Sequence, residues 1–268
     1  MWNSIYEEIT KIREHNHFNG KYRGAACQSC NTNEGKASKV IPIFFHNGSG
    51  YDFHFIVTEL MNYQDTYNKV EVLPKTSEEY ISITYGSYYR KLVFLDSYRF
   101  LQKSLADIGE SLAEEDLKIL REYFPDGIKK KGIYPYEYIT SIESLSLRGL
   151  PPIEKFYSTI KGGTPTEEEY KQAQDVWTKF KCTTFKDYHD IYLKVDVLIL
   201  ADAFEKFREF FLTNHQIDPC YCYSAPGLTW QCGFKYTNIT LDLLTDNDML
   251  LMFEKGIRGG FSGVLGDR

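Results

Sequence analysis

An aspartate that shares a helical face with two tyrosines is the strongest chemical signal in this chain. Asp196 lies in a segment whose apolar residues recur at intervals of three and four, which predicts a helix that is apolar nearly all round and largely buried. Tyr192 precedes it by one helical turn and Tyr188 by two turns. A carboxylate in such a place needs a partner, because an isolated buried charge is costly. We expect that partner to be a metal ion, several hydrogen-bond donors, or a basic residue from another element.

Asp52 is the second candidate acid. It follows the glycine-rich run His46-Asn47-Gly48-Ser49-Gly50, which ends the apolar stretch 40–45, and helical spacing resumes at Phe53. An acid between a strand and a helix stands where α/β sheets place their sites, but an ordinary helix N-cap occupies the same position. Asp52 and Asp196 are far apart in the sequence, so only the fold can bring them together. If they met, they would form a Mg²⁺ or Mn²⁺ site suited to phosphoryl transfer.

The composition of the 268 residues is that of a folded protein. Hydrophobic residues make up 43% and charged residues 25%, enough for one large domain or two small ones. No apolar run approaches the ~18 residues of a membrane span, and the N-terminus is polar, so we expect no membrane contact and an intracellular location. Six cysteines are too few for a disulfide framework. The net charge of −6 argues against a basic coat for nucleic acid, but it permits a local groove and suits a carboxylate metal site.

Hydrophobic periodicity predicts an α/β fold around these acids. Residues 40–45 are expected to form a buried strand, and two further β-rich runs, 80–85 and 91–95, predict a hairpin. Helices are expected from Asp52 and over residues 104–124, 167–181, 185–212 and 241–256. Residues 134–152 and 219–233 carry prolines or glycines and are expected to be irregular.

Several motifs taken together resemble family B DNA polymerases. The run from His46 to Asp52 resembles the second exonuclease motif of that family, and Tyr192-Leu193-Lys194-Val195-Asp196 matches the third, Tyr-x-x-x-Asp. Four segments more specifically resemble the protein-primed branch, including the polymerases of Maverick/Polinton transposons and related viruses: 131–136, 150–152, 188–192 and 256–260. The resemblance covers roughly residues 13–268 and implies a ribonuclease-H-like 3′→5′ exonuclease domain, incomplete in this chain.

The resemblance implies a chemical role for four residues. Asp52 and Asp196 would be ligands of Mg²⁺ or Mn²⁺ in the exonuclease, and Tyr192 would orient the attacking water. Lys131 matches a Lys-x-x-hydrophobic motif whose cation would help to position a phosphate or a metal-bound water. The alternative for Lys131 is a solvated basic loop, because it follows Lys129 and Lys130.

The resemblance also implies residues that contact DNA. Asn47 would hold the single-stranded primer end. Ser97 falls where the family has a Ser-Leu segment that contacts single-stranded DNA, although Tyr98 replaces the usual Leu. In the run Ile257-Arg258-Gly259-Gly260, Arg258, Gly259 and Gly260 match the Tyr-x-Gly-Gly motif that joins exonuclease to polymerase domain, and a plain helix C-cap is the alternative.

Two motifs that the resemblance leads us to expect are missing. The first exonuclease motif, Asp-x-Glu, should precede Asn47, yet residues 1–46 contain none. The palm aspartates of nucleotidyl transfer should follow Gly260, after which eight residues remain. We therefore expect an internal piece of a polymerase whose isolated exonuclease activity is small or absent.

The N-terminal segment resembles half of a phage recombination-endonuclease type zinc site. It contains His15-x-His17 and Cys27-x-x-Cys30, whereas a complete site needs four ligands and would require a second Cys-x-x-Cys. We therefore expect no bound zinc at Cys27 and Cys30. The expected organisation has three parts: a zinc-element remnant (1–39), an exonuclease-like domain (40–212) and a linker toward the polymerase palm (213–268).

The expected function is that of a piece of a protein-primed family B DNA polymerase with proofreading. The partners implied are single-stranded and primer-template DNA, a terminal protein primer, and deoxynucleotides in the full-length enzyme. A nuclear or virion-associated location would follow if the source is a eukaryotic transposon or virus. Two alternatives stay open: a catalytically dead nucleic-acid-binding remnant of a transposon or virus, and a free-standing nuclease.

Overall fold

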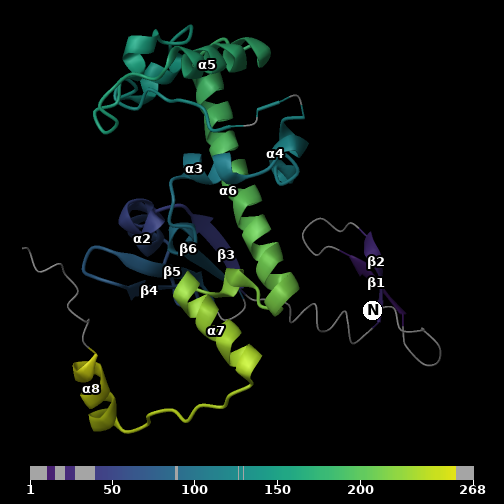
Figure 1. The fold of residues 1–268 in the computed structure, drawn as a ribbon, viewed down its shortest axis with the longest axis vertical. Helices are drawn as coiled ribbons and strands as arrows, with labels where there is room; N and C mark the ends of the chain where they lie inside the picture. The colour runs from purple at the N-terminus through teal and green to yellow at the C-terminus, as the bar shows by residue number, and fades with distance from the viewer. Residues whose placement is uncertain are drawn as a thin grey trace, which may run out of the picture.

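The computed structural model describes residues 11–15, 22–27, 40–87, 90–125, 127–128 and 130–257, the first two ranges by their backbone alone. These residues form α-helices, short 3-10 turns and two separate sheets, so the predicted α/β class is confirmed (Figure 1). The helices are α2 (Asp52–Asn62), α3 (Leu105–Ser111), α4 (Lys118–Tyr123), α5 (Glu167–Lys179), α6 (Phe185–His215), α7 (Ala225–Thr237) and α8 (Asn247–Gly256). The 3-10 turns are η1 (Gly48–Gly50), η2 (Ser97–Arg99), η3 (Ile142–Ser146), η4 (Ile153–Phe156) and η5 (Pro219–Tyr221).

The larger sheet is mixed and has the order β3-β6-β5-β4. Its strands are β3 (Val40–Phe45), β4 (Lys69–Pro74), β5 (Tyr80–Gly86) and β6 (Lys91–Asp96). β4, β5 and β6 form an antiparallel meander, whereas β3 lies parallel to β6 with Phe45 beside Asp96. The predicted strand and hairpin are confirmed, and β4 was not predicted. Because parallel strands end at the same edge, the turn after β3 lies beside the turn after β6.

Helices cover both faces of this sheet. Successive residues of β3 point to opposite faces, as strand geometry requires. Phe45 contacts Phe53 of α2, with ring centroids 5.8 Å apart, and this face includes the buried Ile83. Phe44 contacts Phe204 of α6 at 4.1 Å on the other face. α2 and α6 therefore cover opposite faces of the sheet (Figure 1).

The helix predicted over residues 104–124 is two helices, α3 and α4, and the prediction of one continuous helix was wrong. The cause is a buried acid on α6. Both carboxylate oxygens of Asp202 accept backbone N–H groups, from Ile119 at 2.8 Å and from Leu120 at 2.9 Å. These N–H groups belong to the first turn of α4, where no helical acceptor exists. A new helix start near residue 118 thus satisfies Asp202, and Leu120 packs on α6.

α6 matches the predicted helix and continues to His215, but it is buried along one face only. Leu193 and Val197, which a helix buried nearly all round would cover, are 53% and 59% exposed. The prediction of nearly all-round burial was therefore wrong. The buried face includes Tyr188, Tyr192 and Val195, at the spacing of one helical stripe.

The C-terminal part differs from prediction in one helix. Residues 219–233 were expected to be irregular, but α7 begins at Ala225, where the side chain of Ser224 accepts the backbone N–H of Gly227. α8 occupies part of the predicted 241–256, and none of its residues is buried. Among the described residues no helix, α6 included, combines the length and apolarity of a membrane span.

The smaller sheet is a hairpin of β1 (Lys11–His15) and β2 (Tyr22–Cys27), in which Lys11 lies opposite Cys27. The sequence did not predict these strands. Of the possible zinc ligands, Cys27 is described by its backbone and Cys30 lies outside the described residues. The expectation that no zinc is bound stays a prediction.

Candidate functional site

A buried carboxylate organises the turn where β3 and β6 end. Asp96 is 2% exposed and accepts three backbone N–H groups. Its Oδ1 accepts from Asn47 at 2.8 Å and from Tyr98 at 2.9 Å, and its Oδ2 accepts from Ser49 at 3.0 Å. With its oxygens used this way, Asp96 holds the turn that presents Asn47. Sequence reasoning did not assign it this function, although an acid at the end of an apolar strand was a visible signal.

Ser97 belongs to the same buried network. It is fully buried, its hydroxyl donates to the Phe45 carbonyl at 2.9 Å, and its Oγ lies 3.0 Å from Nδ1 of His46. His46 in turn donates from Nε2 to the Lys103 carbonyl at 2.8 Å. In this structure the Ser97 side chain supports the turn, whereas the neighbouring Tyr98 is exposed. The DNA contact predicted for Ser97 stays a prediction.

Asn47 stands at the exposed tip of this edge. Its backbone is left-handed, with φ at 64°, and its side chain faces solvent. The next residue must be glycine, because a Cβ on Gly48 would lie 2.6 Å from the Phe45 Cβ and 2.8 Å from the Phe53 Cε1. Asp52 follows as the first residue of α2, as predicted, and its carboxylate has no hydrogen bond among the described residues. Asn47 and Asp52 are thus held at one edge, with their side-chain oxygens available.

A second cluster lies on α6 and joins three of the predicted residues. Lys131 forms an ion pair with Oδ2 of Asp196, and its Nζ lies 5.2 Å from the centre of the Tyr192 ring. The side chains of Lys131 and Asp196 are 25% and 18% exposed. The basic-residue alternative for Asp196 is therefore what the structure shows. Oδ1 of Asp196 is buried and has no hydrogen-bond partner among the described residues.

Tyr192 completes this cluster as a neutral phenol. Its hydroxyl lies 2.8 Å from that of Tyr136, a residue of the matched segment 131–136 to which the sequence assigned no role. Burial, followed by this hydrogen bond, raises the pKa of Tyr192 well above its ordinary value. The protonated group can donate or accept a hydrogen bond at neutral pH but cannot act as a phenolate. The two tyrosines at alternate positions, Tyr134 and Tyr136, were the available signal for this contact.

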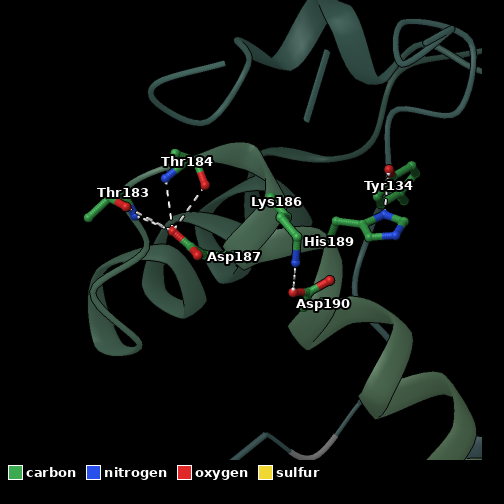
Figure 2. A network of polar contacts seen from close by, with 7 residues as sticks. All are labelled: Tyr134, Thr183, Thr184, Lys186, Asp187, His189 and Asp190. Atoms are coloured by element: carbon green, nitrogen blue, oxygen red, sulfur yellow. Dashed lines mark hydrogen bonds and ion pairs between the residues drawn. The ribbon is translucent and has the colours of Figure 1, made fainter. Parts of the chain in front are cut away.

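The first turns of α6, the helix that also carries Tyr192 and Asp196, are fixed by polar contacts (Figure 2). Asp187 accepts the backbone N–H of Thr184 at 2.9 Å and that of Thr183 at 2.8 Å. These bonds lower its pKa to about 2. Two residues after Asp187, Nδ1 of His189 lies 2.8 Å from the Tyr134 hydroxyl. The loop that carries Lys131 is thereby fastened to the helix that carries Asp196.

The two candidate metal ligands, Asp52 beside the turn after β3 and Asp196 in the cluster on α6, are not brought into contact in the structure. Asp52 and Asp196 belong to helices that cover opposite faces of the sheet, and the ion-pair partner of Asp196 is Lys131. Arg258, Gly259 and Gly260 lie outside those residues. That Asp52 and Asp196 share a metal ion stays a prediction.

The chain matches the sequence model of the family DNA polymerase type B, organellar and viral, over residues 35–260. This match covers most of the chain, and the chain belongs to that family. The predicted resemblance is confirmed at this level. No curated protein and no solved structure matches the chain. Membership points to a DNA polymerase domain that acts on DNA.

Polymerases of this family generally use divalent metal ions such as Mg²⁺, and the described residues fit such an ion only in part. The open Oδ1 of Asp196 is a suitable hard oxygen ligand. However, Lys131 occupies the other oxygen, and within the described residues no group of three His, Cys, Asp or Glu side chains is placed to hold a metal. The described residues therefore do not form a complete metal site.

Proposed function

We propose that this chain is the 3′→5′ exonuclease region of a type B DNA polymerase and that it binds the single-stranded end of a primer. The main support is the cluster on α6. It brings Lys131, from one matched motif, against Tyr192 and Asp196 of another, although more than one element separates them in the chain. The residues have the chemistry for a phosphodiester: a cation, a neutral phenol and a carboxylate.

The turn after β3 supports the DNA-binding part of the proposal. Asn47 is exposed and rigidly presented, because its backbone N–H is bonded to the buried Asp96. Its side-chain amide can both donate to and accept from a strand end. We further propose that Ser97 and Arg258-Gly259-Gly260 lie along the DNA path, on their motif resemblance alone.

Asp52 and Asp196 are proposed as the acids that this chain contributes to a Mg²⁺ or Mn²⁺ site. Further acids would have to come from elsewhere, because the sequence before Asn47 contains no Asp-x-Glu. The ribonuclease-H-like arrangement, the division at residues 39 and 212, and the protein-primed Maverick/Polinton type belong to the same proposal. Its full-length partners would be primer-template DNA, deoxynucleotides and a terminal protein.

A catalytically dead nucleic-acid-binding protein is the second candidate. The observation that favours it is the ion pair of Asp196 with Lys131, which occupies one oxygen of a proposed metal ligand. Both candidates predict DNA binding. They differ in hydrolysis: the exonuclease proposal predicts that the chain hydrolyses DNA once further metal-binding acids join Asp52 and Asp196, and the second candidate predicts that it never does.

The test is single-turnover digestion of a labelled single strand with Mg²⁺, beside fluorescence anisotropy of the same strand in EDTA. We expect binding with little or no digestion, and we expect Asn47→Ala to weaken binding more than Asn62→Ala, which lies at the far end of α2. Absence of binding at low salt would refute the proposal. Rapid digestion that Asp196→Ala abolishes would show that the chain already holds every acid it needs.

A further inference from the structure

The helix α8 exposes a run of five large apolar side chains to solvent: Met249, Leu250, Leu251, Met252 and Phe253. Every residue from 235 to 257 is exposed, so the segment that leads into α8 does not cover them. Figure 1 shows α8 standing apart from the larger sheet and from α6. Exposed apolar surface that is contiguous in this way marks a place of interaction with another molecule.

α8 is also too short to be stable by itself. It has ten residues and begins where Oδ1 of Asp246 accepts the backbone N–H of Met249 at 2.8 Å. Isolated helices shorter than about 12–15 residues are marginal in water, and most helical stability in proteins comes from packing of an apolar face. None of its residues belongs to a hydrophobic cluster of the described part of the chain. The packing that stabilises α8 must therefore come from a partner.

The apolar residues of α8 form a stripe with charges of opposite sign on one flank. Met249, Met252 and Phe253 are spaced by three and four residues and share one face of the helix. Asp248 and Lys255 are seven positions apart, which is about two helical turns, so both border this face on the same side. Neither takes part in an ion pair of the described residues. The flank is therefore acidic near the start of the helix and basic near its end.

We propose that α8 binds α8 of a second copy of this chain, with the two helices antiparallel, and that this contact forms a symmetric dimer. In an antiparallel pair the same flank of each helix faces the other, so Asp248 of one copy lies beside Lys255 of its partner. The two-fold symmetry repeats this contact, which gives two ion pairs at the edge of one apolar seam. A parallel pair would place opposite flanks together and leave both charges without this partner.

The charge of α8 favours a second copy over a lipid surface. Helices that lie on membranes have a polar face rich in Lys and Arg. In α8 the polar positions include Asp248 and Glu254, Asp246 caps its start, and Lys255 is its single basic residue. The inference goes beyond the proposed function, because the contact requires neither DNA, a metal ion nor the Asn47 turn.

The test is sedimentation velocity of the full chain over a concentration series, in EDTA and without DNA. We expect a reversible equilibrium of monomer and dimer with a dissociation constant of micromolar order, because the seam is short. Met252→Glu should abolish the dimer, since position 252 lies near the midpoint between 248 and 255, where the substitution brings two carboxylates together across the symmetry axis. Met61→Glu is the matched control: Met61 is 55% exposed on α2, against 63% for Met252, and its substitution should leave the dimer unchanged. Both positions are exposed, so both variants should fold, which thermal unfolding verifies.

Charge variants test the orientation of the two helices. Asp248→Lys and Lys255→Glu should each weaken the homodimer about tenfold, because each replaces two attractive contacts by two repulsive ones. An equimolar mixture of the two variants should regain the affinity of the parent, since every lysine of one then faces a carboxylate of the other. This recovery separates the ion pairs from any weakening of the helix, because both variants carry that weakening into the mixture.

Several results would overturn the inference. They are a chain that stays monomeric at every concentration, a dimer that survives Met252→Glu or is lost equally in Met61→Glu, and masses that grow beyond the dimer, which would indicate non-specific aggregation. Co-flotation of a monomeric chain with phosphatidylcholine vesicles, abolished by Met252→Glu, would make a lipid surface the occupant instead. Single charge variants that dimerise like the parent would overturn the antiparallel contact. Absence of a dimer with single-strand binding intact would refute this inference alone and leave the proposed function standing.

Discussion

Replacing Asp96 by asparagine should loosen the turn after β3 by a predictable amount. In the variant the retained oxygen can still accept from Asn47 and Tyr98, which both bond to Oδ1. The new amide NH₂ takes the place of Oδ2 and faces the N–H of Ser49, so that one charge-assisted bond is lost and a buried donor is left without an acceptor. Such a bond contributes about 1.5–3 kcal/mol, and an orphaned donor costs about 1–3 kcal/mol. We expect Asp96→Asn to lower the free energy of unfolding by about 3 kcal/mol.

The assay is equilibrium unfolding in urea, with single-strand anisotropy measured under conditions where each variant is folded. Asp65→Asn is the matched control, because Asp65 also accepts two turn N–H groups, from Tyr67 and Asn68, but is exposed to solvent. It should be far less destabilised. A stability of Asp96→Asn within about 0.5 kcal/mol of the parent would refute the assignment of Asp96 as the organising acid. Unchanged DNA binding by the folded variant would refute the inference that this turn positions Asn47.

Three further predictions concern α6 and the DNA contacts. In a double-mutant cycle, Lys131→Met and Asp196→Asn should show a coupling of about 1 kcal/mol in chemical unfolding, since the pair is mostly buried; additive effects would contradict the ion pair. The depressed pKa of Asp187, about 2, means that its contribution to stability is present above its ordinary value of 3.8 and is lost as the pH falls toward about 2. The melting temperatures of the parent and Asp187→Asn should therefore converge over that interval, and a constant difference would count against the capping role. Single-strand binding should be no tighter than micromolar, and Lys131→Ala and Arg258→Ala should each reduce its salt slope by about 0.7; unchanged slopes would place the phosphate contacts elsewhere.

Strong periodicity explains which elements were predictable. The strand at 40–45, the hairpin and the helices α5 and α6 each have a continuous pattern and clear boundary residues, such as Thr166 before α5. α7 was missed because Pro226 and Gly227 look like turn residues. In the structure the proline lies in the first turn of the helix, where its missing N–H costs nothing.

Tertiary contacts explain what the sequence could not predict. The break between α3 and α4 depends on Asp202, more than two elements further along the chain, and no local pattern announces it. Lys131 and Asp196 were both selected from the sequence, but their pairing was one of several alternatives because 65 positions separate them. The exposure of Leu193 and Val197 likewise depends on which neighbours α6 has, not on its own composition.

Motif residues and supporting residues are recognised by different signals. Asn47, Asp52 and Lys131 were found because their types and spacing resemble a family. Asn47 is exposed and Asp52 has no hydrogen bond among the described residues, whereas Lys131 is paired with Asp196. Asp96 and Asp202 were not assigned a function, yet they are almost fully buried and satisfy five backbone N–H groups between them. A buried acid that accepts backbone N–H groups fixes geometry because any movement would leave a charge without donors. The turn of Asn47 and the packing of α4 on α6 are therefore preorganised by the protein alone, and a bound strand would not have to order the Asn47 turn.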